Sequence, residues 1–157
     1  MKINDILFKI KTALSLSQSE MVEAYALADY TISKERLENV LKRRQDPDYQ
    51  EATYEELGSF LDGLILFKRG KNLVKKDEEE VVELTNNLIM KKLRVALELK
   101  EPELLIIFGL AEINMTKRQI GSLFRKEGTK NFKYASDELL MAFIEGLDEF
   151  YYDGEEI

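Results

Sequence analysis

Apolar residues recur at every third or fourth position along almost the whole chain, which is the spacing of one face of an α-helix. Near the amino terminus such a face consists of Ile6, Leu7, Ile10 and Leu14. No segment alternates apolar and polar residues in the way that a half-buried strand does. The pattern therefore predicts an all-α protein.

The same pattern occurs twice. Residues 4–67 align with residues 87–150 without an insertion or a deletion, and Gly63-Leu64, for example, matches Gly146-Leu147. Most apolar positions that differ exchange one hydrophobic residue for another, as two copies of one core should. A single repeat of about 65 residues would be marginally stable alone. The sequence thus predicts two tandem copies of a four-helix unit that are packed on each other through a shared apolar face.

Composition suggests where the repeats begin and end. We expect helical repeat 1 at residues 1–71, a charged connector at 72–86, helical repeat 2 at 87–150 and an acidic tail at 151–157. Gly70 follows Lys68 and Arg69, a sequence typical of a helix C-terminus. We expect residues 71–83 to be partly helical and partly flexible.

Polar residues with capping chemistry mark the predicted helix starts. The first helix is predicted from about Asn4 to Leu16, with Asn4 as its cap, and the copy of this segment begins at Asn87. Glu20 and Glu56 stand three residues after a hydroxyl residue, which is the spacing of a capping box. The other predicted caps are Ser17, Ser33 and Thr53 in the first repeat and Thr116 and Ser136 in the second.

The sequence has neither cysteine nor histidine. It therefore has no disulfide, no thiolate or imidazole metal ligand and no catalytic triad that depends on imidazole. The four consecutive acids at 77–80 lack the glycine turn of a calcium loop, and no glycine-rich phosphate loop is present. We expect no enzyme activity, no catalytic residues, no cofactor and no metal.

The net charge of −7 is unevenly distributed. Residues 1–71 carry 11 basic and 12 acidic side chains, and residues 87–147 carry 10 basic and 8 acidic ones. The excess acid lies in the connector and after residue 147. Because the repeat bodies are nearly neutral, the net charge alone does not exclude a polyanionic partner.

Gly63 and Gly146 lie inside strongly apolar predicted helices, where glycine costs about 1 kcal/mol relative to alanine. Two interpretations explain a glycine at both matching places: close packing of two helices, or close approach of a ligand to the backbone. The neighbouring acids Asp62 and Glu145 fit the polar side of the same helix.

The second and third helices of each repeat, joined by a short turn, resemble a helix-turn-helix. The third helices are predicted at residues 33–44 and 116–126; the first carries the acids Glu35 and Glu38, and the second carries none. Helix pairs with short turns also occur in ordinary bundles, so both interpretations stay open. The candidate nucleic-acid-binding residues are Lys34, Lys42, Arg43, Arg44, Lys117, Arg118, Gln119, Ser122, Arg125 and Lys126.

Several segments resemble the YehS-like family of small bacterial proteins, whose members also consist of two tandem copies of one helical domain. These segments are Ala13-Leu14-Ser15-Leu16, Ala26-Leu27-Ala28-Asp29, Phe60-Leu61-Asp62-Gly63-Leu64-Ile65 and Arg69-Gly70-Lys71. The resemblance implies a bacterial cytoplasmic protein. Because the family's function is unknown, the resemblance implies no catalytic or binding residues. Relatives often have a cysteine before the fourth helix, where this chain has Ala52 and Ala135.

These observations lead to one hypothesis and one alternative. The chain is expected to be a non-enzymatic helical-repeat binding protein of the cytoplasm, with no membrane partner, whose partner is another protein bound across the two repeats. The alternative is a helix-turn-helix-like nucleic-acid-binding protein that uses the third helix of each repeat, with the second repeat as the better candidate.

Overall fold

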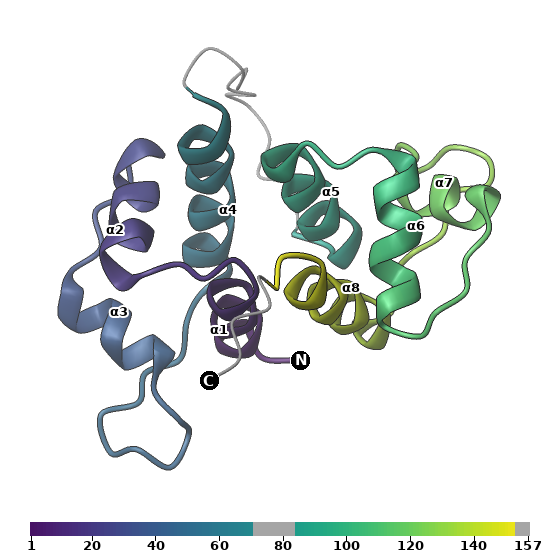
Figure 1. The fold of residues 1–157 in the computed structure, drawn as a ribbon. Helices are drawn as coiled ribbons and strands as arrows, with labels where there is room; N and C mark the ends of the chain where they lie inside the picture. Colours follow the sequence, from purple (N-terminus) through teal and green to yellow (C-terminus); the bar gives the residue numbers. More distant parts are fainter. Residues whose placement is uncertain (71–83, 153–157) are drawn as a thin grey trace.

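The structure is a computed structural model that describes residues 1–70 and 84–152, and Figure 1 shows its fold. The described residues form α-helices without any strand, which confirms the all-α prediction. The first repeat comprises α1 (Ile3–Ala13), α2 (Gln18–Leu27), α3 (Lys34–Leu41) and α4 (Tyr54–Arg69). The second repeat comprises α5 (Asn86–Leu97), α6 (Glu101–Leu110), α7 (Lys117–Phe124) and α8 (Asp137–Phe150).

The predicted connector and tail fall largely outside these ranges. Residues 71–83 and 153–157 lie outside the described residues, so the expectation of a partly helical connector has no structural counterpart here. Thr85, near the end of the predicted connector, caps α5 by accepting a hydrogen bond from the Leu88 amide. None of the described helices combines the length and the apolar character that crossing a membrane requires.

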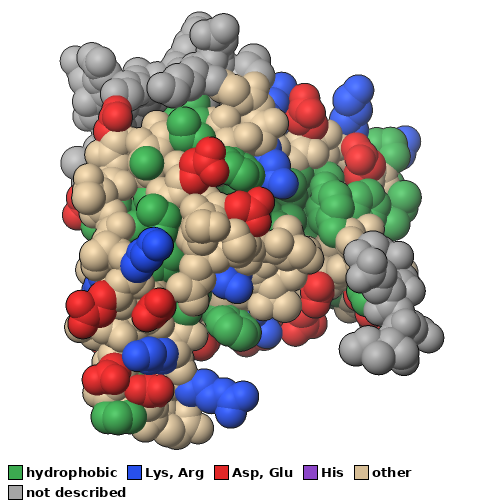
Figure 2. Space-filling view, turned by 60° about the vertical axis from the view of Figure 1, so that its left-hand side comes forward, with side chains coloured by type: hydrophobic (Ala, Val, Ile, Leu, Met, Phe, Trp, Pro, Cys, Tyr) green, Lys and Arg blue, Asp and Glu red, His purple; other side chains and the backbone are tan. Residues whose placement is uncertain are grey.

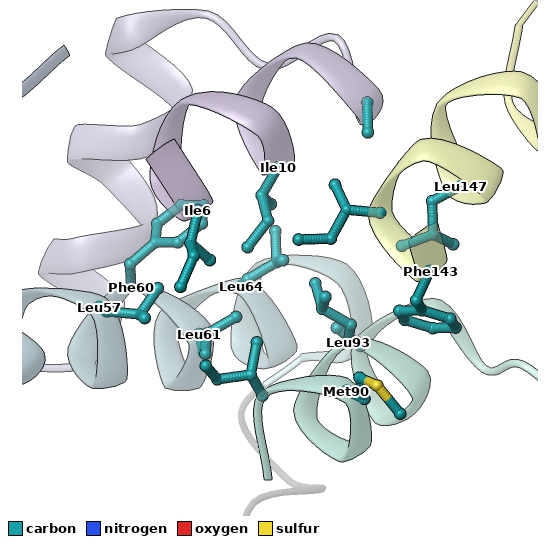
Figure 3. Packing of buried hydrophobic residues seen from close by; sticks show 14 of the residues in the cluster. Ile6, Ile10, Leu57, Phe60, Leu61, Leu64, Met90, Leu93, Phe143 and Leu147 are labelled. Atoms are coloured by element: carbon teal, nitrogen blue, oxygen red, sulfur yellow. The ribbon is translucent and has the colours of Figure 1, made fainter. Parts of the chain in front are cut away.

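The two repeats share one core, as predicted. Helix α4 packs against α5, and α1 packs against α8. Because α5 is the copy of α1 and α8 is the copy of α4, these two contacts are equivalent, and the repeats are related by an approximate two-fold arrangement. Figure 3 shows Ile10 and Leu64 of the first repeat lying opposite Leu93 and Leu147 of the second.

Glycine permits the closest helix contact within each repeat. A Cβ atom on Gly63 would lie 1.8 Å from the carbonyl oxygen of Ala24, and one on Gly146 would lie 2.1 Å from that of Ile107. Helix α4 therefore crosses α2, and α8 crosses α6, at a distance that excludes even a methyl group. This confirms the helix-packing interpretation of both glycines.

The prediction that Asn4 caps the first helix is wrong. Lys2 is the N-cap residue of α1, and Asn4 is buried within the helix. The Asn4 side-chain amide donates to the carbonyls of Val40 and Gln50, at 2.9 and 2.8 Å, and its oxygen accepts from the Ala52 amide at 3.0 Å. Asn4 thus holds the loop between α3 and α4 against α1.

Asn87 repeats this arrangement in the second copy. It donates to the carbonyls of Leu123 and Lys133, at 2.9 and 2.8 Å, and accepts from the amide of Ala135 at 2.9 Å. A buried polar group is stable only when it is hydrogen-bonded, and all these bonds are made to backbone groups at the end of the third helix and in the loop that follows it. We call this three-bond arrangement the asparagine clamp.

The loop that each clamp holds also explains why the third helices are shorter than predicted. Helix α3 ends at Leu41 and α7 at Phe124, where the sequence suggested continuation to Arg44 and Lys126. The Asn39 carbonyl accepts from Gln50, as the Ser122 carbonyl does from Lys133, so the last carbonyls have loop partners instead of a next helical turn. The first helix likewise ends at Ala13 rather than Leu16.

The remaining predicted helix starts are confirmed. The hydroxyl side chain of each of these cap residues accepts a hydrogen bond from the backbone amide three residues later. They are Ser17, Ser33, Thr53, Thr116 and Ser136. Glu20 and Glu56 complete the two predicted capping boxes. Gly70, with a φ of 89°, ends α4 as expected.

Candidate functional site

The four basic candidates of the first repeat do not lie together on a helix. Lys34 is exposed in the first turn of α3, but Lys42 is the C-cap residue, and Arg43 and Arg44 lie in the following loop. Lys42 pairs with Asp48 of the same loop at 3.7 Å. Residues 33–50 contain five basic and four acidic side chains. This part of the surface therefore has little net charge.

Figure 2 views the molecule from the first-repeat side. The loop after α3 forms its lowest part in both views, and there acidic and basic side chains alternate. A duplex backbone is bound by a surface of uniformly positive potential. The mixed charges make the third helix of the first repeat a poor surface for nucleic acid.

Arg36 of α3 is used inside the protein. Its guanidinium donates two hydrogen bonds to the carboxylate of Glu56 on α4, at 2.9 and 2.8 Å, and others to the side chain of Gln50 and the carbonyl of Glu51. Glu56 is only 3% exposed. A bidentate pair of this geometry fixes both side chains and leaves neither charge buried without a partner.

Burial by itself would raise the pKa of Glu56, but the hydrogen bonds from Arg36 and Thr53, with the nearby positive charge, outweigh it and lower the pKa below its ordinary value. The Glu56 hydrogen bond raises the pKa of Arg36. Burial, reinforced by the Glu56 charge, raises the pKa of Tyr25. Each group therefore keeps its usual charge at neutral pH, which argues against a proton-transfer role.

The ion pair borders an open hollow on the surface of the first repeat. Its lining includes Tyr30, Ser33, Arg36, Thr53 and Glu56. The positions that match Arg36 and Glu56 in the second repeat are Gln119 and Leu139, so the charged pair is not repeated. The only strong cation in the hollow is already bound by a carboxylate. We therefore assign the Arg36–Glu56 pair a structural role in joining α3 to α4.

Among the described residues, no ion pair neutralises the basic side chains of the second-repeat candidates. Lys117 and Arg118 are exposed in the first turn of α7, and Arg125 and Lys126 are exposed at its end and in the loop. Residues 116–133 contain six basic side chains and one acidic one. Helices α6 and α7 pack against each other, as α2 and α3 do in the first repeat. The charge difference between the two third helices, expected from the sequence, is thus present at the surface.

Two of the candidates use a side-chain oxygen in a hydrogen bond within α7. Ser122 is buried, and its hydroxyl donates to the Gln119 carbonyl at 2.6 Å, so we remove Ser122 from the set of surface residues. The Gln119 side-chain oxygen accepts from the Thr116 amide at 2.9 Å and completes a capping box. The burial of Ser122 could have been predicted from the helical pattern, because Ser122 lies between Ile120 and Leu123, which are both buried.

The outer side of α6 is an apolar surface that the sequence reasoning missed. Ile106 is 53% exposed and Leu110 is 39% exposed, and Pro102 and Gly109 are also exposed on this side. Leu105 is half-buried between them. We call these five residues the α6 face. Helix α6 is apolar almost all round, and such a helix is normally covered on every side.

Comparison with α2, the copy of α6 in the first repeat, shows that the fold does not require this surface. Where α6 has Ile106 and Gly109, α2 has Glu23 and Ala26. No described atom lies within 4 Å of a Cβ placed on Gly109. Unlike Gly63 and Gly146, Gly109 therefore has no packing role among the described residues, although it weakens the helix by about 1 kcal/mol relative to alanine.

A second apolar side chain is exposed where the repeats meet. Phe8 of α1 is 52% exposed and lies in a groove between α1 and α8 that Lys9, Ile144, Glu145 and Asp148 also line. On the opposite side of the molecule the position of Phe8 is occupied by Lys91. There Lys92 of α5 forms an ion pair with Asp62 of α4, which joins the two repeats. Asp62 thus has a structural partner.

The described residues contain no group of three or more acidic side chains placed to hold a metal ion. The acidic run at 77–80 lies outside the described residues. Asp29 and Glu112 both have a positive φ, at 58° and 62°, and form the turn after the second helix of each repeat. Their matching conformation supports the interpretation of both as turn residues.

A family model described as "Protein of unknown function (DUF1456)" matches the chain twice, at residues 4–70 and 86–151. The chain is also similar to the protein described as "Uncharacterized protein YehS" of Escherichia coli (strain K12). The two are 31% identical over 144 residues, which cover 92% of each chain. No solved structure matches the chain significantly.

Proposed function

We propose that this chain, which belongs to the DUF1456 family of proteins of unknown function, is a non-enzymatic protein-binding module whose contact surface is the α6 face. The observation that carries the proposal is the exposure of Ile106 and Leu110 on either side of Gly109. Contiguous apolar surface of this kind on a soluble domain typically marks a site of protein association.

The proposal differs in one respect from the expectation drawn from the sequence. We expected a surface built across both repeats, but the α6 face lies on the second repeat alone. A bacterial cytoplasmic setting, which the family resemblance implies, remains part of the proposal. So does the lack of catalysis, which is supported by the absence of histidine and cysteine. Turnover of a metabolite by purified protein in an activity screen would contradict it.

Affinity capture from a lysate of the host bacterium tests the proposal. The wild-type chain, Ile106→Glu and Phe8→Lys serve as baits, each with and without nuclease. Ile106 and Phe8 are equally exposed, and the two substitutions introduce the residues Glu and Lys that the other repeat has at these positions. We expect the wild type to capture a partner protein both with and without nuclease. Phe8→Lys should capture the same protein, and Ile106→Glu should not. Capture that is unchanged by Ile106→Glu would contradict the proposal.

The basic surface of α7 supports nucleic-acid binding as a second candidate function. Lys117, Arg118, Arg125 and Lys126 are exposed around one short helix, whereas acidic side chains offset most of the basic charge around the third helix of the first repeat. Lysine and arginine side chains provide most of the affinity for a phosphate backbone by releasing counterions. Binding through all four would give a slope of about −3.6 in log K against log salt concentration.

Fluorescence anisotropy with a labelled duplex tests this candidate. We expect binding at low salt that weakens steeply as salt increases and is lost in Lys117→Glu/Arg118→Glu. The matched control is Lys34→Glu at the position equivalent to Lys117 in the first repeat, which should bind like the wild type. An absence of binding at low salt, or equal losses in the variant and the control, would contradict the candidate.

A further inference from the structure

We infer that the occupant of the α6 face is a second copy of this chain, bound with the two α6 helices antiparallel about a two-fold axis. This inference rests on the proposed function, because it identifies the partner at the same surface. It goes beyond that proposal by fixing the identity of the partner and the register of the contact.

The α6 face is complementary to itself in shape. Ile106 and Gly109 are three residues apart and so lie on the same side of the helix. In an antiparallel pair whose axis passes between Ile107 and Phe108, Ile106 of each copy lies over Gly109 of the other, and Leu105 lies beside Leu110. Ile106 of each copy then fills the space beside Gly109 of the other copy, so the same contact is made twice. An isologous interface needs this reciprocity.

The charges at the two ends of the α6 face favour the antiparallel direction. Glu101 lies at the start of α6, and Lys117 and Arg118 lie just beyond its end at the start of α7. Two antiparallel copies bring the acid of one toward the two bases of the other, at both ends of the contact. A parallel pair would place like charges together. With Lys100 and Glu103 counted beside Glu101, the start of α6 has a net charge of −1, and with Glu112 counted, the other end has a net charge of +1.

The chain already uses the two elements of this contact internally. Its repeats pack by an approximate two-fold arrangement, and each repeat has a close helix crossing at a glycine. On one side of α6, the backbone at Ile107 packs directly against Gly146 of α8. Gly109 is the corresponding opening on the other side of α6, where no described atom fills it. A second α6 helix supplies the missing atoms.

Sedimentation equilibrium of the full chain over a range of concentrations tests the inference. We expect the wild type to be in equilibrium between monomer and dimer. Gly109→Gln should weaken the dimer at least tenfold, because its side chain blocks the helix crossing, while its Cβ meets no described atom of the monomer within 4 Å. Ile106→Glu should do the same. The control Phe8→Lys, which removes an equally exposed apolar side chain on α1, should dimerise like the wild type.

A charge exchange tests the direction of the helices. Glu101→Lys should weaken the dimer, and adding Lys117→Glu and Arg118→Glu to the same chain should restore most of the loss. Thermal unfolding at a concentration where every variant is monomeric shows whether the monomer is intact: Gly109→Gln should unfold at the wild-type temperature or above it.

The outcomes separate this inference from the proposed function. A wild-type chain that is monomeric at all concentrations overturns the dimer, and α6-dependent capture of a different protein would still support the proposed function. A dimer that Gly109→Gln and Ile106→Glu leave intact overturns the assigned surface. Failure of the charge exchange to restore binding overturns the antiparallel register.

Discussion

The two repeats have the same backbone architecture and different surfaces. Both have an asparagine clamp, a close helix crossing at a glycine and hydroxyl caps on their third and fourth helices. The first repeat adds the Arg36–Glu56 ion pair and presents mixed charges around α3. The second replaces this pair with Gln119 and Leu139, exposes the α6 face and presents an excess of basic residues around α7. Shared features therefore build the fold, and the differences mark the surfaces at which we propose that binding takes place.

The largest effect is expected from separating the repeats. Deleting residues 84–157 removes α5 and α8, against which α4 and α1 pack, and exposes Ile10, Leu61 and Leu64 to water. The loss of apolar burial at this size leaves too little stability for a folded unit. We expect a fragment without a cooperative thermal transition, as measured by circular dichroism. A sharp transition would show that each repeat folds independently.

The next largest effect is expected at the two glycine crossings. Gly63→Ala and Gly146→Ala should each lower the free energy of unfolding by about 3 kcal/mol, because the added methyl group forces the helices apart. The matched control is Gly58→Ala in α4, where a Cβ meets no described atom within 4 Å, and it should be neutral or stabilising by up to about 1 kcal/mol. Urea denaturation measures all three. A loss at one crossing only would show that the repeats are not equivalent there.

The asparagine clamps should matter somewhat less. Asn4→Ala and Asn87→Ala each remove the clamp bonds to one carbonyl of the third helix and to one carbonyl and one amide of the loop, at a cost of roughly 2–3 kcal/mol. The first-repeat loop is also held by hydrogen bonds from Arg36 to Gln50 and Glu51. We therefore expect hydrogen exchange to accelerate more in the second-repeat loop of Asn87→Ala than in the first-repeat loop of Asn4→Ala. Equal acceleration would remove this distinction between the repeats.

The smallest effect is expected at the ion pair. Arg36→Gln should cost about 2 kcal/mol, less than a fully buried pair, because the Arg36 side chain is 30% exposed. Arg36→Gln/Glu56→Leu, which copies the second repeat, should lie within about 1 kcal/mol of the wild type at neutral pH, since no buried charge is left without a partner.

The same variants give a test by pH. Because the folded pKa of Glu56 is lowered, the stability it contributes is present above its ordinary pKa of 4.5 and is lost as the pH falls through the lowered value. The wild type should therefore lose stability in acid more steeply than the double variant. Acid titrations of both proteins, followed by circular dichroism, measure this difference. If both lost stability equally with falling pH, the ion pair would not be the cause of the lowered pKa of Glu56.

Much of the fold could be predicted from the sequence because its signals are local. A hydroxyl residue followed by an acid three positions later marks a helix start whatever surrounds it, and Ser17 and Thr53 behave in this way. The repeat predicted a shared core, since one copy alone cannot bury its apolar face. The charge difference between the third helices could also be read directly from the residues.

The prediction failed where a distant residue decides the local structure. Asn4 has the composition of a cap, yet it holds a loop almost 50 residues away. That loop provides the partners that end α3, so no local pattern at Arg43 or Arg44 could show that they lie outside the helix. The α6 face had a sequence signal, an unbroken apolar run from Leu104 to Phe108, but this run is equally typical of a fully covered helix.

The amino-acid sequence by itself determined the fold class, the duplication and the helix starts, because helical period and capping depend on residues within one or two turns. Only the tertiary structure decided where the third helices end, why two glycines are needed and which side of α6 is left uncovered. Each of these depends on contacts between segments that are distant along the chain and meet only when the two repeats have folded.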